Sequence, residues 1–253
     1  MQSRSTIRRR VRRIAIAVLL IVTGLCGFGG YIGYFGGPIL TMLPATARPA
    51  PAKARLAAVY LSGDMGFKMG MAPRIAARLT ADGIPVIGVN SLNYFRHERT
   101  RAEVESLVAD LTRRALTFGH ADKVILIGQS FGADILQTGL VGLPPALRAK
   151  VRMVALVVPT DTVLLHASPS EIFTWLSPET DALATAHKLD WVPVTCIHGM
   201  QESRSLCPLW RQANVDVVAL PGGHPLRGDA DAVHAVLSRA IDRSASLAQD
   251  ARE

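Results

Sequence analysis

The sequence predicts an α/β fold in which a mainly parallel sheet of about six strands carries helices on both faces. Short β-branched apolar runs alternate with longer amphipathic stretches through most of the 253 residues, as they do in proteins built from βα units. One of these runs leads directly into Gly-Gln-Ser-Phe-Gly at 128–132, a pattern typical of a tight turn from strand to helix. The length suits one such domain with an N-terminal appendage, and no second domain is expected.

The chain opens with a basic segment that is followed by an apolar one. Six arginines precede the first acidic residue: Arg4, Arg8, Arg9, Arg10, Arg12 and Arg13. They supply most of the formal net charge of +8 and leave about +2 for the rest, so the charge argues for membrane topology and against nucleic-acid binding. Residues 14–37 carry no charge and are long enough to cross a bilayer as a helix. We therefore predict a single-pass transmembrane signal anchor over residues 14–37, with residues 1–13 cytoplasmic and the chain from about Pro38 outside the cytoplasm.

Two other interpretations of this region remain open. Ala45-Thr46-Ala47 resembles the small-residue cleavage site of an unusually long signal peptide. Cys26 suggests a lipoprotein, but Leu25 stands before it where a small residue is needed. Residues 38–54 are rich in proline and alanine and are expected to be a linker.

The globular domain is expected over residues 55–243, with a frayed tail at 244–253. Its predicted strands are short apolar runs at 55–61, 84–89, 123–127, 151–158, 191–197 and 215–220. Its predicted helices lie near 71–82, 100–118, 131–142 and 229–243, where apolar residues recur at helical spacing. This order leaves no room for extra antiparallel strands at the start of the domain. The irregular stretch 159–190, with Phe173, Trp175 and Leu176, is either a lid over a site or a long packed loop.

The pentapeptide around Ser130 predicts a nucleophile on a sharp turn, the elbow that marks the α/β-hydrolase fold. Gly128 and Gly132 flank the serine because a Cβ at either position would strike a neighbouring strand or helix. Such a turn lifts the hydroxyl above the sheet and points the following helix at the oxygen that becomes negative during acyl transfer. The oxyanion hole would take one backbone N–H from Phe131 and a second from Asp64 or Met65, in the glycine-bearing loop 62–67.

A base and an acid follow in the order that this fold requires. His224 comes directly after the expected last strand on a glycine-rich loop, a position that the other six histidines do not share. Glu202 follows the preceding strand and would hold the His224 tautomer and stabilise the imidazolium. Asp161, which follows the strand at 151–158, is the alternative acid.

The cysteines are consistent with an oxidising compartment. Because Cys26 lies in the expected membrane segment, Cys196 and Cys207 are the one pair in the exported domain, and they flank Glu202. A disulfide is expected here, since the loop lacks the further ligands that a metal would need. The sequence shows no phosphate-binding loop and no metal-ligand cluster, so we expect neither a cofactor nor a metal.

Five blocks of the sequence together resemble one protein family. They are Leu-Ser-Gly-Asp-Met-Gly-Phe at 61–67, residues 83–95, residues 126–134, Cys-Ile-His-Gly at 196–199 with Cys-Pro at 207–208, and Pro-Gly-Gly-His at 221–224. This pattern is similar to the bacterial VirJ/AcvB virulence proteins, although Met65, Phe67, Arg96 and Arg204 differ from the residues usual there. The resemblance implies a periplasmic serine hydrolase that removes the amino acid from aminoacylated phosphatidylglycerol, chiefly the lysyl form. With the predicted anchor, it implies a single-pass protein of the bacterial inner membrane whose domain lies in the periplasm.

A cationic aminoacyl group would seek a carboxylate near Ser130. Asp64 and Asp134 are the nearest candidates by motif, although Asp134 could instead be a buried structural residue. The expected partner is a membrane phospholipid, with secretion-system or exported proteins as further possible partners. One alternative function is a membrane-tethered binding or assembly factor for export or virulence secretion that uses the hydrolase fold without catalysis. The other is an esterase with a different substrate.

Overall fold

A seven-stranded sheet forms the centre of the computed structural model, which describes residues 2–169 and 180–250. The strands are β1 (Leu40–Leu43), β2 (Leu56–Leu61), β3 (Val86–Val89), β4 (Lys123–Gln129), β5 (Val151–Val157), β8 (Val194–Gly199) and β9 (Val215–Leu220). Their order is β1-β3-β2-β4-β5-β8-β9, and every pairing except that of β1 with β3 is parallel. A separate antiparallel pair joins β6 (Thr162–Val163) and β7 (Thr180–Asp181). The predicted α/β fold is confirmed.

Helices cover both faces of this sheet. The helices of the described residues are α1 (Gln2–Ile32), which lies outside these two layers, α2 (Ala72–Ala81), α3 (Ser91–Tyr94), α4 (Arg101–Phe118), α5 (Phe131–Leu140), α6 (Pro145–Arg148), α7 (Ala182–Ala186) and α8 (Ala230–Asp250), with short 3-10 turns η1 (Pro51–Lys53), η4 (Cys207–Leu209) and η5 (Leu226–Gly228). Alternate residues of a strand face opposite sides of the sheet, so Val59 enters the core beneath α4 and α5 while Tyr60 enters the one beneath α2 and α8. Both faces of the central strands are therefore buried.

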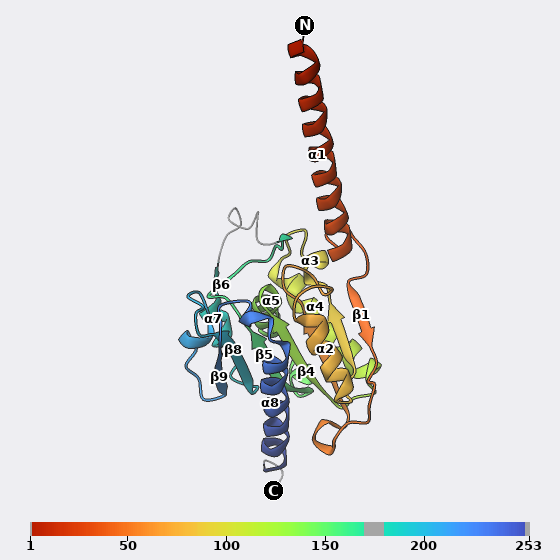
Figure 1. Ribbon diagram of the computed structural model, residues 1–253. Coiled ribbons are helices and arrows are strands. Elements are labelled where there is room, and N and C mark those ends of the chain that lie inside the picture. The colour runs from red at the N-terminus through yellow and green to blue at the C-terminus, as the bar shows by residue number, and fades with distance from the viewer. Residues whose placement is uncertain (1, 170–179, 251–253) are drawn as a thin grey trace.

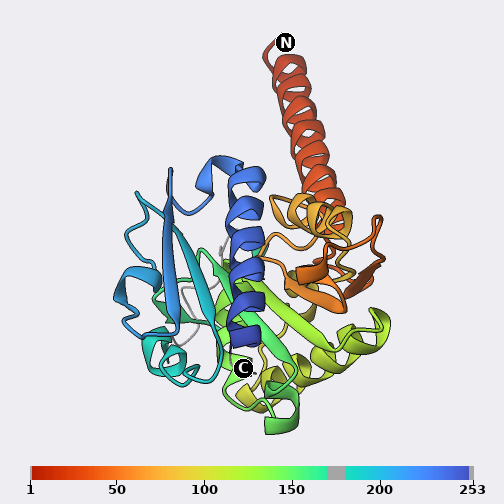
Figure 2. The ribbon, with the colours of Figure 1, turned by 90° about the horizontal axis from the view of Figure 1, so that it is seen from below.

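The apolar helix α1 projects away from the sheet (Figure 1). The view from below in Figure 2 shows the same projection, with the N-terminus at the outer end of α1. Within α1, Ile7–Ile32 is long and apolar enough to cross a membrane, and nearly all of its surface is exposed. A membrane anchor and a signal sequence both have this property.

Strand β1 corrects the expected linker over residues 38–54. Leu40 to Leu43 pair antiparallel with Val89 to Val86 and make β1 the seventh strand, where the sequence predicted about six and no antiparallel addition. Four residues in a segment rich in proline and alanine are too short for an alternating pattern to stand out. Lys53, at the end of the 38–54 segment, donates hydrogen bonds to Asp82 at 2.7 Å and to Ser238 of α8 at 2.9 Å. These bonds hold the end of the segment against α8.

Two other boundaries differ from the sequence expectation. Helix α8 continues to Asp250 instead of fraying after residue 243, and Ser244 is buried with its hydroxyl bonded to the Ile241 carbonyl. Strand β8 begins at Val194 instead of residue 191, because Pro193 has no N–H to donate to a strand ladder.

We predict that Asp82 ties η1 to α8 in a pH-dependent way. Burial raises the pKa of Asp82, but hydrogen bonds from Lys53 and His234 outweigh that effect and leave the pKa below its usual value. A carboxyl group whose pKa is lower in the folded state than in the unfolded state stabilises the fold at any pH above its unfolded-state pKa. That stabilisation is lost as the pH falls through the folded-state pKa. The loss of stability in Asp82→Asn, measured by urea unfolding, should therefore be clear at pH 7 and shrink below about pH 4.

Asp231→Asn is the matched control for this change. Its carboxylate pairs with Arg78, but its side chain is 79% exposed, and exposed pairs contribute little. An equal effect of both substitutions at pH 7 would contradict the prediction.

Candidate active site

Ser130 occupies a strained turn between β4 and α5. Its φ of +53° and ψ of −128° are unusual for a residue with a side chain. A Cβ at Gly128 would lie 2.4 Å from the Gly132 carbonyl oxygen, and one at Gly132 would lie 2.4 Å from the carbonyl oxygens of Leu61 and Ser62. Both positions therefore require glycine, for the reason that the sequence suggested. The Ser130 N–H donates to the Val157 carbonyl at 2.8 Å, so the end of β5 also holds the turn.

A tyrosine on β2 supports the strand that leads to this turn. The Tyr60 hydroxyl donates to the side-chain oxygen of Gln129 at 2.8 Å. Burial raises the pKa of the Tyr60 phenol far above its usual value, so that it remains a neutral donor.

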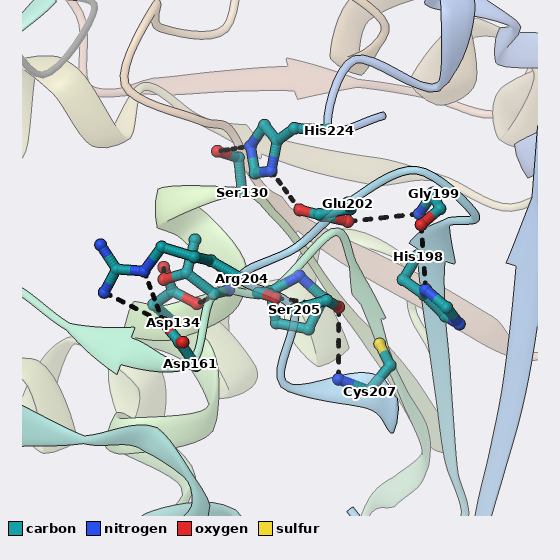
Figure 3. A network of polar contacts seen from close by, with 12 residues as sticks. Ser130, Asp134, Asp161, His198, Gly199, Glu202, Arg204, Ser205, Cys207 and His224 are labelled. Atoms are coloured by element: carbon teal, nitrogen blue, oxygen red, sulfur yellow. Dashed lines mark hydrogen bonds and ion pairs between the residues drawn. The ribbon is translucent and has the colours of Figure 1, made fainter. Parts of the chain in front are cut away.

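Ser130, His224 and Glu202 form a continuous chain of polar contacts (Figure 3). Ser130 Oγ lies 2.7 Å from His224 Nε2, and His224 Nδ1 lies 2.5 Å from Glu202 Oε1. The other carboxylate oxygen of Glu202 accepts the Gly199 N–H at 3.2 Å. The Glu202 side chain is 5% exposed and the His224 side chain is 40% exposed, so the carboxylate is shielded from water while the imidazole is partly accessible to solvent. These distances suit a serine that donates to Nε2 and an Nδ1–H that donates to the acid.

The loops after β8 and β9 are packed against each other, which brings Glu202 to His224. A Cβ at Gly199 would lie 2.4 Å from the Gly223 carbonyl oxygen and 2.5 Å from that of Gly222. The Gln201 N–H donates to the Gly222 carbonyl at 2.9 Å. The sequence analysis named Gly199 only as part of the block at 196–199 and gave it no role in the site, although its position at the end of β8 was a signal for one.

The alternative acid Asp161 is directed elsewhere. Its carboxylate forms a salt bridge with Arg204 at 3.1 Å, as Figure 3 shows. The carboxylate that meets His224 is that of Glu202, so the geometry favours the first of the two expected acids.

The loop after β2 lies beside the serine. A Cβ at Gly63 would come within 3.3 Å of the Ser130 Cβ, and the Gly66 N–H closes the turn onto the Gly63 carbonyl at 3.1 Å. Asp64 and Met65 are the two half-buried residues inside this turn. They remain the predicted second donors of an oxyanion hole, with Phe131 at the start of α5 as the first.

Asp134 has a structural role, because its carboxylate is bonded within the protein. It is 4% exposed, and its two oxygens accept the backbone N–H of Thr160 at 2.9 Å and the Thr160 hydroxyl at 2.8 Å. These bonds join α5 to the start of the segment at 159–190. Of the two carboxylates suggested for a cationic substrate, the placement therefore favours Asp64.

Comparison with known proteins identifies the family of the chain. Residues 55–245 match the family described as bacterial virulence protein (VirJ). The chain belongs to the VirJ family. None of the curated proteins matches it.

Solved structures with a similar fold are hydrolases. Proline iminopeptidase from Mycobacterium smegmatis has a TM-score of 0.58 and 11% identity, covering 83% of this chain and 95% of its own. The Bacillus licheniformis lipase BlEst2 has a TM-score of 0.55 and 12% identity, with 81% and 99% covered. Est1E from Butyrivibrio proteoclasticus has a TM-score of 0.52 and 14% identity, with 80% and 93% covered. At these identities the likeness shows a shared fold, the α/β-hydrolase fold, which this VirJ family member was predicted to have.

A disulfide joins Cys196 and Cys207 in this VirJ family member, as predicted. The two Cα atoms are 5.5 Å apart, 11 positions separate the cysteines in the sequence, and both are fully buried. The bond closes the loop that carries Glu202 and ties its far end to β8. Its geometry suits a role in holding the acid in place.

The segment expected to be a lid is described only in part. The β6–β7 pair and α7 lie within it, whereas Phe173, Trp175 and Leu176 lie outside the described residues. The lid remains a prediction.

We predict that Ser130 is an activated nucleophile that a fluorophosphonate probe labels. Ser130→Ala should abolish labelling and lower ester hydrolysis by about 10³-fold or more, and His224→Ala should do nearly the same, because each removes an essential part of the attack. His234→Ala is the control, since His234 on α8 also contacts a carboxylate, that of Asp82 at the end of α2, and takes no part in the contacts of Ser130. Activity of Ser130→Ala within tenfold of the unaltered protein would contradict the assignment.

Loss of the disulfide should affect activity more than folding. Closing so short a loop contributes about 3 kcal/mol through chain entropy, and reducing the disulfide also frees the loop that positions Glu202, on which turnover depends. Circular dichroism and ester turnover, measured on the same sample before and after reduction, check this. Two free thiols in natively exported protein, detected by mass spectrometry, would refute the pairing.

Proposed function

We propose that the protein is a membrane-anchored serine ester hydrolase that removes the amino acid from aminoacylated phosphatidylglycerol, chiefly the lysyl form. The contact chain from Ser130 through His224 to Glu202 is the observation that carries the proposal. The fold, the glycine-bearing loop beside Ser130 and the VirJ family membership support it.

The reaction follows from the geometry of these groups. Ser130 Oγ attacks the ester carbonyl as its proton passes to His224 Nε2, and the buried Glu202 stabilises the imidazolium. Backbone N–H groups of Phe131 and of Asp64 or Met65 stabilise the oxyanion. His224 then gives the proton to the glycerol oxygen, which leaves as phosphatidylglycerol. Water, deprotonated by His224, attacks the aminoacyl-serine, and the free amino acid leaves as Ser130 recovers its proton.

The substrate class is supported by the expected anchor and by one carboxylate. An ester in a lipid headgroup meets a membrane-held site at high effective concentration. Asp64 belongs to the loop that flanks Ser130, and we propose it as the carboxylate that attracts the ammonium groups of a lysyl ester.

Retention of α1 is supported by what cleavage would remove. A cut after Ala47 would take away β1, which pairs along the whole of β3, and Ile32, which is fully buried in the core. The arginines before Ile14 favour a periplasmic position for the domain. An intact α1 therefore serves the fold as well as the location.

Purified full-length protein incubated with lysyl-phosphatidylglycerol in detergent should release free lysine, and Ser130→Ala should not. Turnover of a short-chain ester without release of lysine would leave the hydrolase assignment in place and remove the lipid assignment. If neither substrate is turned over and the fluorophosphonate probe does not react, the protein is a binding or assembly factor instead.

A further inference from the structure

The membrane-proximal end of α1 is built into the globular domain. Ile32, its last residue, is fully buried in the same core cluster as Leu92 and Phe131. The Asn90 side-chain amide donates to the Ile32 carbonyl at 2.9 Å, and the Asn93 amide donates to the Gly37 carbonyl at 2.7 Å. The first bond satisfies a carbonyl at the end of α1 that would otherwise need water, and the second holds the chain five residues beyond that end.

This junction also touches the loop beside the nucleophile. A Cβ at Gly66 would lie 2.7 Å from the Ile32 carbonyl oxygen and 2.9 Å from Asn90 Oδ1. Gly66 closes the turn onto Gly63, whose Cβ position would in turn contact the Ser130 Cβ. The contacts run without a gap from the end of α1 to the nucleophile.

The length of α1 sets the depth of the junction relative to a bilayer. A helix from Ile14 to Ile32 rises about 28 Å, which is close to the about 30 Å of a hydrocarbon core. With Arg13 at one surface, Ile32 reaches the other surface at the point where the domain already begins. Tyr31 and Phe35 are exposed there, as expected for aromatic side chains at an interface, and Lys68 lies over the Tyr31 ring at 5.2 Å.

We propose that this junction fixes the catalytic edge of the sheet against the surface of the bilayer that holds α1, so that the site takes headgroup esters from that same bilayer. No flexible tether separates the anchor from the loop beside Ser130. Lys68, together with Arg96 near Gly36, adds positive charge that attracts anionic headgroups. The choice of an aminoacyl lipid rests on the proposed function, whereas the docking does not.

Fluorescence quenching tests the docking without any substrate. Full-length protein carrying Cys26→Ser is placed in phosphatidylglycerol vesicles with a headgroup-labelled quencher, and a dye is attached at Lys68→Cys or, as the reference, at Lys150→Cys. Lys150 is exposed at the start of β5, about 20 Å along the sheet from its catalytic edge. Quenching at position 68 should exceed that at position 150 by at least about threefold, since bilayer contact is limited to one edge.

The matched variants separate docking from folding. Asn90→Asp keeps the oxygen that caps α3 through the Asn93 N–H but removes the donor to Ile32, so it should bring the two quenching values together. Asn214→Asp removes a similar donor to the Leu189 and Val192 carbonyls, away from the anchor, and should change nothing. Ile32→Ala loosens the same junction through packing and serves if Asn90→Asp does not fold. Equal quenching at both positions in the unaltered protein, or a preference for position 68 that survives both junction variants, would overturn the proposal.

The lipid assay then tests the consequence. Lysine release should be at least about tenfold faster when protein and lysyl-phosphatidylglycerol share a vesicle than when the lipid is supplied in protein-free vesicles. Equal rates would overturn access from the same bilayer. If no lysine appears in either arrangement while position 68 is quenched, the proposed substrate fails and the docking stands.

Discussion

The close approach of α5 to the end of β2 is the constraint on which the site depends. The backbone at Gly132 passes so near the Leu61 and Ser62 carbonyls that no side chain fits between them. This contact forces the turn before α5 to be abrupt and places Ser130 at a positive φ. The cost of that backbone strain is offset by the sheet that leads to the turn, since β4 is paired from Lys123 to Gly128 with β2 and from Val124 to Gln129 with β5.

Parallel strands explain why residues far apart in the sequence meet at this edge. All six parallel strands end on the same side, so the loops after β2, β4, β8 and β9 converge there. Each loop contributes one function to the proposed site: oxyanion donors near Gly63, the nucleophile Ser130, the acid Glu202 and the base His224. The acid is held twice, by the Gly199 N–H and by a disulfide that closes its loop. A site assembled from four separate loops thereby gains the rigidity that precise proton transfer requires.

The same regularity explains what could be predicted from the sequence. Ser130, His224 and Glu202 each follow a strand that could be recognised from its apolar run, and the structure brings the three together. Strand β1 was missed because its four residues pair only through a contact with β3, which is remote in sequence. The role of Asp134 depends on Thr160, which comes 26 residues later and has no local signal. Residue patterns along the chain are enough to predict helices, strands and their ends. Contacts between single residues that are far apart in the sequence can be identified only once the fold is known.

The N-terminal segment contributes to the globular domain as well as forming the apolar helix α1. Without β1, the hydrogen-bonding groups of β3 would form an open edge, which invites pairing with other chains. Without Ile32, the core would lack an apolar side chain next to the loop that flanks Ser130. An apolar N-terminal helix that contributed only targeting would need neither contact. The N-terminal segment therefore supplies an edge strand to the sheet and an apolar side chain to the core beside the loop that flanks Ser130.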